Sequence, residues 1–248
     1  MPAHPEYAIL GNGCWAGVMH GILSQQSKVT IVPQTRRLEQ ESDPEYQTRM
    51  GASLAATAAQ AAWICVPPSP NTLLLAAAAV NNRMHVLAEK PWIWPAFSSQ
   101  PILAQASANG VLVGVHYEYC LLDAVESWRS QHRSRAGLQF RGRFTTSAPD
   151  RLRIPALENL GSHLFAIREY AVPGAEVSAI DCGYDQPDQR VVSLTHGDRS
   201  IAEIDFSDNR EPIIQRFINR FERAMVGDSF PFTLDFALRV LSALKALR

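Results

Sequence analysis

The sequence lacks paired cysteines, long apolar runs and a large net charge. Its four cysteines are widely spaced and form no Cys-x-x-Cys pair, so neither a disulfide framework nor a zinc site is indicated. No apolar run reaches the roughly 18 residues that span a bilayer, and the opening residues lack a secretory signal. The net charge of −1 gives no general attraction to nucleic acid or to an anionic membrane. We therefore expect a cytoplasmic protein with mostly buried free thiols and no metal.

The 248 residues suffice for one large domain or two small ones. In the first half, short apolar runs typical of strands alternate with helical segments, which predicts a parallel sheet with helices on both faces. The predicted strands are 7–10, 28–32, 62–66, 84–88 and 111–115, and the predicted helices are 17–23, 50–60, 71–81 and 101–108.

After about residue 116 the pattern changes to strands joined by turns, interrupted and followed by helices. The predicted strands are 139–146, 177–184, 190–195 and 200–206, and the predicted helices are 121–132, 157–170, 212–226 and 233–247. The fold class expected is α/β. A doubly wound Rossmann domain spans residues 1–118, and an α+β domain with an open, mainly antiparallel sheet spans 119–248.

A glycine-rich turn follows the first predicted strand. The run Gly11-Asn12-Gly13-Cys14-Trp15-Ala16 fits the dinucleotide fingerprint G-x-G-x-x-A, and it lies between a strand and a helix as that fingerprint requires. Glycines let the backbone approach a pyrophosphate, which the helix N-terminus can bind. The alternative is a glycine turn without a ligand.

The end of the second predicted strand bears on the choice between NAD and NADP. An NAD site usually places an acid there to hold the ribose 2′-hydroxyl, but this sequence has Pro33 and no acid before Glu39. Thr35, Arg36 and Arg37 could instead bind a 2′-phosphate, because guanidinium groups bind phosphate through paired hydrogen bonds. We expect NADP(H) to be preferred over NAD(H). The alternative is that both arginines belong to a solvated loop.

The tripeptide Glu89-Lys90-Pro91 follows the predicted strand 84–88. A lysine at a strand end of an α/β sheet lies at the rim where ligands bind, and the proline fixes the backbone beside it. Near a nicotinamide, such a lysine can exchange a proton with a substrate hydroxyl or carbonyl. Taken alone, the tripeptide is more often a surface lysine at a strand end.

These features together resemble the Gfo/Idh/MocA family of oxidoreductases. The resemblance covers nearly the whole chain and rests on segments 9–13, 64–69, 85–91 and 159–164, followed by a similar ending over 217–247. It implies a Rossmann domain, a second domain whose open sheet often forms dimers or tetramers, and hydride transfer between NAD(P) and a carbinol or carbonyl. It also implies that Lys90 contacts the reacting oxygen and that His163 is the acid/base. Asn159 stands where many members carry an aspartate.

Residues four apart on a helix share a face, so Asn159 and His163 can point the same way. The catalytic residues expected are therefore Lys90, His163 and Asn159; the alternative for His163 is a core histidine. Expected in substrate binding are Tyr117, Tyr119, Arg151, Arg153, Asn159 and His163. Expected in cofactor binding are Gly11, Asn12, Gly13, Cys14, Trp15, Thr35, Arg36, Arg37, Val66, Pro67, Pro68, Asn71, Glu89 and Lys90.

The chain departs from the family at three positions. Asn159 cannot ionise, Ala166 replaces a frequent aspartate, and Glu118 stands where arginine is common. The chain is also short for the family, and we expect the first domain to be complete and the second to be reduced. The function expected is an NAD(P)-dependent dehydrogenase or reductase acting on a small polar substrate such as a sugar, a cyclitol or a related compound, anionic ones included. The alternatives are a non-catalytic dinucleotide-binding protein and a cyclic imine reductase.

Overall fold

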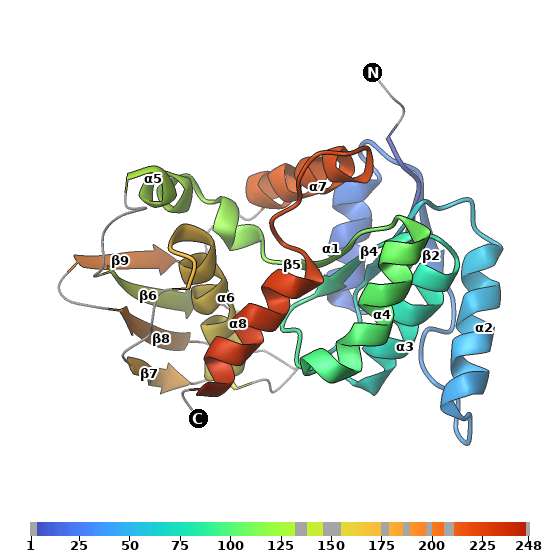
Figure 1. The fold of residues 1–248 in the computed structure, drawn as a ribbon, viewed down its shortest axis with the longest axis horizontal. Helices are drawn as coiled ribbons and strands as arrows, with labels where there is room; N and C mark the ends of the chain where they lie inside the picture. The colour runs from blue at the N-terminus through green and yellow to red at the C-terminus, as the bar shows by residue number, and fades with distance from the viewer. Residues whose placement is uncertain are drawn as a thin grey trace. The chain divides into compact units, whose positions relative to one another are not determined.

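The computed structural model describes residues 4–131, 138–145, 155–174, 179–185, 189–196, 200–205 and 211–246 (Figure 1). The chain forms two compact units. The first holds Met1–His116 and Ile218–Leu234, and the second holds Tyr117–Phe217 and Asp235–Arg248. The first unit therefore contains a segment from late in the sequence, after the second unit has begun.

A five-stranded parallel sheet forms the centre of the first unit. Its strands are β1 (Tyr7–Leu10), β2 (Val29–Val32), β3 (Ala61–Ile64), β4 (His85–Glu89) and β5 (Val113–His116), in the order β2-β1-β3-β4-β5. Strands β1, β3 and β5 are buried at every residue, as expected when helices cover both faces of a sheet. The predicted doubly wound α/β domain is confirmed.

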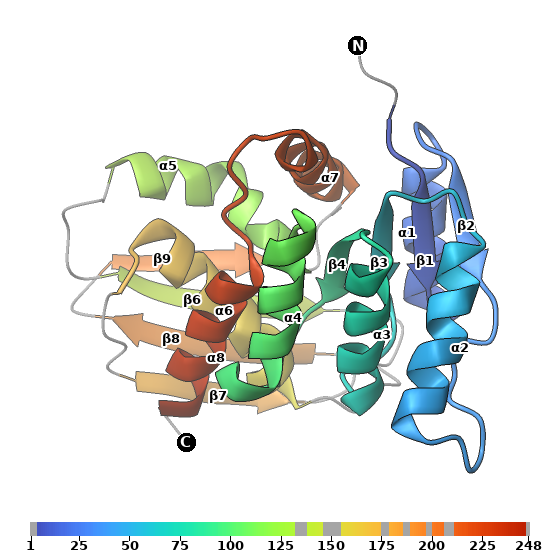
Figure 2. The ribbon, with the colours of Figure 1, turned by 45° about the vertical axis from the view of Figure 1, so that its right-hand side comes forward.

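The helices between these strands divide over the two faces of the sheet. They are α1 (Cys14–Leu23), α2 (Asp43–Ala55), α3 (Pro70–Asn81) and α4 (Ala96–Asn109). The connection from β1 to β2 moves towards one edge of the sheet, whereas the connections from β2 to β3, β4 and β5 move towards the other edge. Because such crossovers are right-handed, α1 lies on one face of the sheet and the later helices lie on the other. Helices α2, α3 and α4 lie side by side on the other face (Figures 1 and 2).

The prediction of a helix over 50–60 was wrong in its bounds. Helix α2 starts at Asp43, because Ser42 and Glu45 form a capping box and Pro44 favours the first turn. It ends at Ala55, before the Thr57 hydroxyl donates to the Leu54 carbonyl oxygen at 2.7 Å. The alanine-rich composition therefore continued past the end of the helix.

The two edges of the sheet differ. At the β5 edge, the Val115 N–H donates to the Phe232 carbonyl oxygen at 3.0 Å, and Gly114 forms an antiparallel bridge with Thr233. At the other edge no further strand of the described chain pairs with β2, whose Thr30 and Ile31 are exposed. The dinucleotide fold often has six strands, with one beyond β2. Here α2 leads directly across β1 to β3, so the described sheet has five strands.

The second unit contains a four-stranded sheet, in the order β7-β8-β6-β9, packed against a long helix. The strands are β6 (Leu138–Thr145), β7 (Ala179–Asp185), β8 (Gln189–His196) and β9 (Ser200–Asp205), and α6 (Ala156–Ala171) covers them. Two of the three pairings are antiparallel and the β6–β9 pairing is parallel, which confirms the mainly antiparallel sheet.

The remaining helices are η1 (Glu118–Leu121), α5 (Asp123–Gln131), α7 (Glu211–Met225) and α8 (Leu234–Ala246). Residues 118–121 form a short 3-10 helix, so the predicted helix over 121–132 begins later, at Asp123. Within the described residues, no helix is long and apolar enough to span a membrane.

Candidate functional site

The strands of the parallel sheet end at nearly the same level. Leu10 pairs with Val32 and with Ile64, Ile64 pairs with Ala88, and Glu89 pairs with His116. The loops that leave these strands therefore emerge at one edge, where doubly wound sheets bind ligands. Most of the predicted cofactor residues lie in these loops or in the helix turns that follow them.

The glycine turn after β1 passes directly against the loop after β3. Gly11 has a φ of +141°, and a Cβ at this position would lie 2.9 Å from the Cys65 carbonyl oxygen. Only glycine fits such a backbone and such a contact. Cys65 is followed by Val66, Pro67 and Pro68, so the two predicted cofactor segments meet at the point where the strand order reverses.

Helix α1 begins without a side-chain cap. Gly13 is its N-cap residue, and it makes no side-chain cap hydrogen bond. Asn12, Gly13 and Cys14 are exposed. Uncapped amides at a helix N-terminus bind phosphate oxygens well, so this turn fits the diphosphate of a dinucleotide. Helix α3, whose second residue is the predicted Asn71, also lacks a side-chain cap hydrogen bond at Ser69.

Glu89 is the centre of a cluster of polar and aromatic side chains. The Trp63 indole N–H donates to Glu89 Oε1 at 2.8 Å, and His116 Nδ1 lies 3.2 Å from the same oxygen. Trp15 also helps to lower the pKa of this carboxylate. His116 is fully buried, stacked on Trp15 with ring centroids 6.2 Å apart and met by the edge of Trp63 at 5.0 Å. The strands β3, β4 and β5 are thus joined through one carboxylate, and α1 joins the cluster through the stacking of Trp15 on His116.

The surroundings of Glu89 keep it ionised. Burial alone would raise its pKa, but the charge and hydrogen bond of His116, with smaller contributions from Trp15 and Trp63, outweigh burial and lower the pKa. The buried Cys65 thiol responds in the opposite way: burial, and then the charge of Glu89, raise its pKa well above the ordinary value. The cluster therefore holds a carboxylate at the strand ends, with a neutral thiol nearby.

Lys90 follows this carboxylate directly, and its side chain is half-buried. The Lys90–Pro91 peptide bond is cis. Beyond it, Trp92 is buried and its indole N–H donates to Ser99 Oγ at 3.0 Å, while its ring meets Trp94 at 4.9 Å. The backbone of Lys90 is thus anchored on one side by Glu89 and on the other by Trp92.

The three residues predicted to bind a 2′-phosphate have different environments. The Thr35 side chain is only 6% exposed, which leaves it little access to a ligand. Arg37 donates from Nε to the Glu41 carbonyl oxygen at 2.7 Å and pairs with Asp43. Arg36 is exposed, and its side chain makes no hydrogen bond or ion pair with any residue that the structure describes. Of the three, Arg36 is best placed to bind an external anion.

In the second unit, His163 lies on α6 and is 3% exposed. Its ring makes edge-to-face contacts with two tyrosines from the start of this unit. The ring centroids are 4.7 Å apart for Tyr119 and 6.4 Å apart for Tyr117. The predicted substrate residues Tyr117, Tyr119 and His163 are therefore brought together. Asn159 is half-buried one turn before His163, and its carbonyl oxygen accepts from Ser162 Oγ at 2.9 Å.

Two of the three departures from the family pattern, Ala166 and Glu118, are buried in this unit. Ala166 has no exposed surface, and Glu118 is 2% exposed. An aspartate at position 166 would be a buried charge, so the alanine suits the environment that this chain provides. Arg151 and Arg153 lie outside the described residues.

Sequence reasoning missed two members of the Glu89 cluster, Trp63 and His116. The alignment of the strand ends could have indicated His116, because it ends β5 directly beside Glu89 at the end of β4. Among the described residues no cluster of histidine, cysteine, aspartate or glutamate could hold a metal ion. The described cysteines Cys14, Cys65 and Cys120 are free; the last two are buried, as predicted for most, and Cys14 is exposed.

No family model and no curated protein matches the sequence, but solved structures match it over nearly its whole length. The UDP-N-acetylglucosamine 3-dehydrogenase of Acidithiobacillus ferrooxidans has 14% identity and a TM-score of 0.70, covering 99% of this chain and 97% of that one. An inositol dehydrogenase homologue from Azotobacter vinelandii, complexed with NADH and myo-inositol, has 12% identity and a TM-score of 0.68, covering 99% and 94%.

A third structure, GenD2 from gentamicin A biosynthesis in complex with NAD, has 16% identity and a TM-score of 0.64, covering 99% and 93%. At these identities the likeness concerns the fold. The chain therefore has the fold of the Gfo/Idh/MocA-type oxidoreductases, as the resemblance of its motifs predicted.

Proposed function

We propose that this protein is an NAD(P)-dependent oxidoreductase that acts on a small polar substrate, with NADP(H) preferred. The observation that supports it most is the set of strand ends in the first unit. An uncapped glycine turn suited to a diphosphate, the Glu89 cluster and Lys90 share one edge of the sheet. Solved structures of other proteins with this fold include a UDP-N-acetylglucosamine 3-dehydrogenase and an inositol dehydrogenase homologue bound to NADH.

A bound nicotinamide would accept or give a hydride at its C4 atom. In this chain, Lys90 and His163 would then hold and move the proton of the substrate oxygen, since imidazole titrates near neutral pH and a lysine ammonium is a hydrogen-bond donor. Asn159 would hydrogen-bond a substrate hydroxyl but cannot act as a base. Lys90 would therefore carry a larger share of the proton transfer than it would beside an ionisable partner.

The test pairs binding with turnover in Lys90→Ala and His163→Ala variants. Candidate substrates are cyclitols and sugar nucleotides with NADP⁺, and ketones and cyclic imines with NADPH. We expect both variants to bind NADPH while turnover falls by about 10² to 10⁴, the usual contribution of acid–base catalysis. Unchanged turnover in both variants would refute this mechanism.

The second candidate is a non-catalytic dinucleotide-binding protein. The non-ionisable Asn159 and the buried Ala166 favour it. In that case the wild-type protein binds NADPH but turns over no substrate from the panel, and the two alanine variants behave like the wild type.

The preference for NADP(H) rests on Arg36. We expect fluorescence titration to give tighter binding of NADPH than of NADH, and Arg36→Ala to narrow the difference by about tenfold, the effect of one lost charge-assisted hydrogen-bonding group. Tighter binding of NADH by the wild-type protein would contradict this preference.

The proposal also includes a cytoplasmic location and a homo-oligomer, a dimer or tetramer formed through the four-stranded sheet. The exposed free thiol of Cys14 suits a reducing compartment. Light scattering coupled to gel filtration measures the oligomeric state, and a monomer at micromolar concentration would contradict it.

A further inference from the structure

Arg49 on α2 binds the loop after β2 through all three of its guanidinium nitrogens. Nε and Nη2 donate to the two carboxylate oxygens of Glu41 at 2.8 and 2.9 Å. Nη1 donates to the Gln34 carbonyl oxygen at 2.7 Å, and Nη2 also donates to the Arg36 carbonyl oxygen at 3.2 Å. The Arg49 side chain therefore connects the start of the loop, at Gln34 and Arg36, with its end at Glu41.

Glu41, the acid in this arrangement, closes the loop from its other end. Its Oε2 accepts from the Leu38 N–H at 3.0 Å, and its carbonyl oxygen accepts from Arg37. The hydrogen bond from Arg49 is the main cause that lowers the pKa of Glu41 to about 2, so the carboxylate is ionised at neutral pH. We refer to Glu41 and Arg49 together as the loop clamp.

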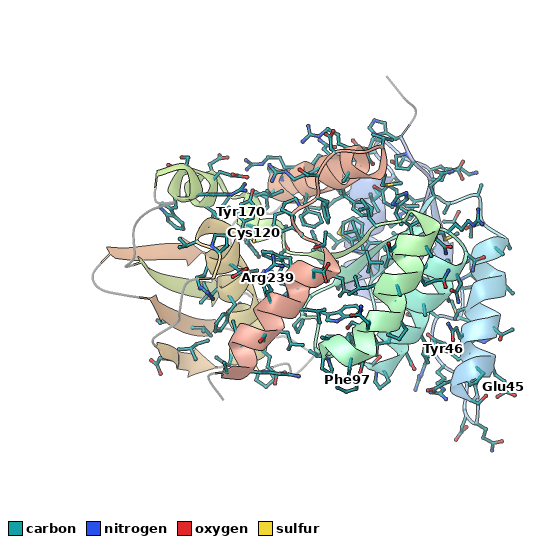
Figure 3. The ribbon with its side chains drawn as sticks, viewed as in Figure 1. Glu45, Tyr46, Phe97, Cys120, Tyr170 and Arg239 are labelled. Atoms are coloured by element: carbon teal, nitrogen blue, oxygen red, sulfur yellow. The ribbon has the colours of Figure 1, made fainter. Side chains whose placement is uncertain are left out.

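Tyr46, one turn before Arg49 on α2, supports the same loop (Figure 3). Its hydroxyl donates to the Thr35 carbonyl oxygen at 2.6 Å, and the Arg49 guanidinium lies over its ring at 5.4 Å. The carbonyl oxygens of Gln34, Thr35 and Arg36 are therefore all held by side chains of α2.

Most of the charged side chains near the end of β2 are paired with one another or held by hydrogen bonds. Arg49 is paired with Glu41, Arg37 with Asp43, and Glu45 is held by Ser42 in the helix cap. Within the described part of the chain, Arg36 and Glu39 make no such side-chain contact, and both are exposed. These two suit opposite ligands, since a guanidinium binds a phosphate and a carboxylate binds ribose hydroxyls.

We propose that Arg49 is a positioning residue for cofactor choice: by fixing the Gln34 and Arg36 carbonyls and neutralising Glu41, it presents Arg36 to the 2′-phosphate of NADP(H). This inference rests on the proposed dinucleotide-binding function. Without Arg49, the Glu41 carboxylate would repel the phosphate, and the loop that carries Arg36 would lose two of its backbone anchors.

The test measures binding of the adenosine half alone, with 2′,5′-ADP and 5′-AMP as probes in calorimetric titrations. The ratio of the two dissociation constants reports on the 2′-phosphate, and a general structural role of Arg49 would change both constants together. We expect Arg49→Met to weaken 2′,5′-ADP binding about tenfold, through the lost charge-assisted contacts, and to change 5′-AMP binding by less than about twofold.

Two further variants separate position from charge. Arg49→Lys keeps the charge, but its three N–H donors cannot bind both carboxylate oxygens and both carbonyls at once, and Arg49→Met combined with Glu41→Gln restores neutrality without the clamp. Both should weaken 2′,5′-ADP binding selectively, and Arg49→Lys also serves if Arg49→Met does not fold. Arg223→Ala is the matched control. It removes an exposed arginine of α7 whose Nε lies 3.6 Å from Oδ2 of Asp228, a residue just after the helix. Both dissociation constants should stay unchanged in this variant.

The inference is overturned if Arg49→Lys or the double variant keeps the wild-type ratio, because charge alone would then explain the selectivity. A wild-type protein that binds 5′-AMP as tightly as 2′,5′-ADP, with Glu39→Gln weakening both, would overturn it in favour of an NAD-type site. If the wild-type protein binds neither these probes nor NADPH nor NADH, the proposed dinucleotide-binding function is refuted as well. Binding of NADPH or NADH by the wild-type protein therefore distinguishes failure of this inference from failure of the proposed function.

Discussion

The ends of β1 and β2 lie next to each other in the sheet but are built in opposite ways. After β1 the chain turns through Gly11, and α1 begins with no side-chain cap. After β2 the chain is filled with side-chain contacts, and α2 begins with a capping box formed by Ser42 and Glu45. The first end leaves backbone amides available to a ligand, whereas the second satisfies its backbone groups internally. A ligand at the second end must therefore be recognised by side chains, and its selectivity can change without altering the fold.

The largest effect is expected from Gly11→Ala, which would make the β1 end resemble an ordinary turn. The added Cβ would lie 2.9 Å from the Cys65 carbonyl oxygen on a backbone with φ of +141°. We expect a loss of about 2–4 kcal/mol in the free energy of unfolding, from backbone strain and from the clash. Dinucleotide binding should fall below detection, because the loops after β1 and β3 must separate. Urea denaturation and NADPH titration measure the two effects.

Gly17→Ala is the control in the same segment. Gly17 lies within α1, and no atom is near enough to meet an added Cβ. Because alanine favours a helix, this variant should gain up to about 1 kcal/mol and bind NADPH normally. If Gly11→Ala behaved like Gly17→Ala, the close approach of the two loops would not be needed for binding.

A smaller loss of stability is expected at the end of β4, where Glu89→Ala would leave the Trp63 indole N–H and the buried His116 imidazole without their acceptor. An unsatisfied buried donor costs about 1–3 kcal/mol, so we expect a loss of about 2 kcal/mol after relaxation. Glu89→Gln keeps one acceptor and should lose less. Chemical denaturation at neutral pH gives both values.

The pH dependence of Glu89→Gln tests the ionised state of Glu89. Because its pKa in the folded protein lies below the ordinary 4.5, the ionised carboxylate stabilises the fold fully above that pH. The stability difference between wild type and Glu89→Gln should therefore be constant near pH 7 and shrink as the pH falls below about 4.5. Glu39→Gln, which alters an exposed acid, should show no such change. A difference that grew towards low pH would contradict an ionised Glu89.

The sequence predicted the β1 end better than the β2 end, and the reason is physical. Gly11 and Gly13 belong to a short local motif, and the apolar runs on either side set the strand and the helix. The position of Lys90 directly after a strand could also be predicted, because a strand, a lysine and a proline are adjacent in the chain. These are local patterns.

The contacts at the β2 end and around Glu89 are not local. Arg49 lies 13 residues after Arg36, and His116 lies 27 residues after Glu89. Only the crossover helix and the strand register bring these pairs together. The capping box that sets the start of α2 was local and could have been found from Ser42 and Glu45, but the alanine-rich stretch beyond it gave a stronger helical propensity.

The smallest effect is expected from Tyr46→Phe, which removes one hydrogen bond from the β2 end. The Tyr46 hydroxyl donates to the Thr35 carbonyl oxygen, and burial raises the pKa of Tyr46 to about 12, so the phenol keeps its proton at every working pH. Phenylalanine fills the same space, so we expect a loss of about 1 kcal/mol in the free energy of unfolding. The ratio of NADPH to NADH binding should change by less than about twofold, because Arg49 still holds the Gln34 and Arg36 carbonyls. A loss of discrimination as large as that expected for Arg49→Met would instead make Tyr46 the residue that positions the loop, and the difference between the two strand ends would then depend on a single phenol.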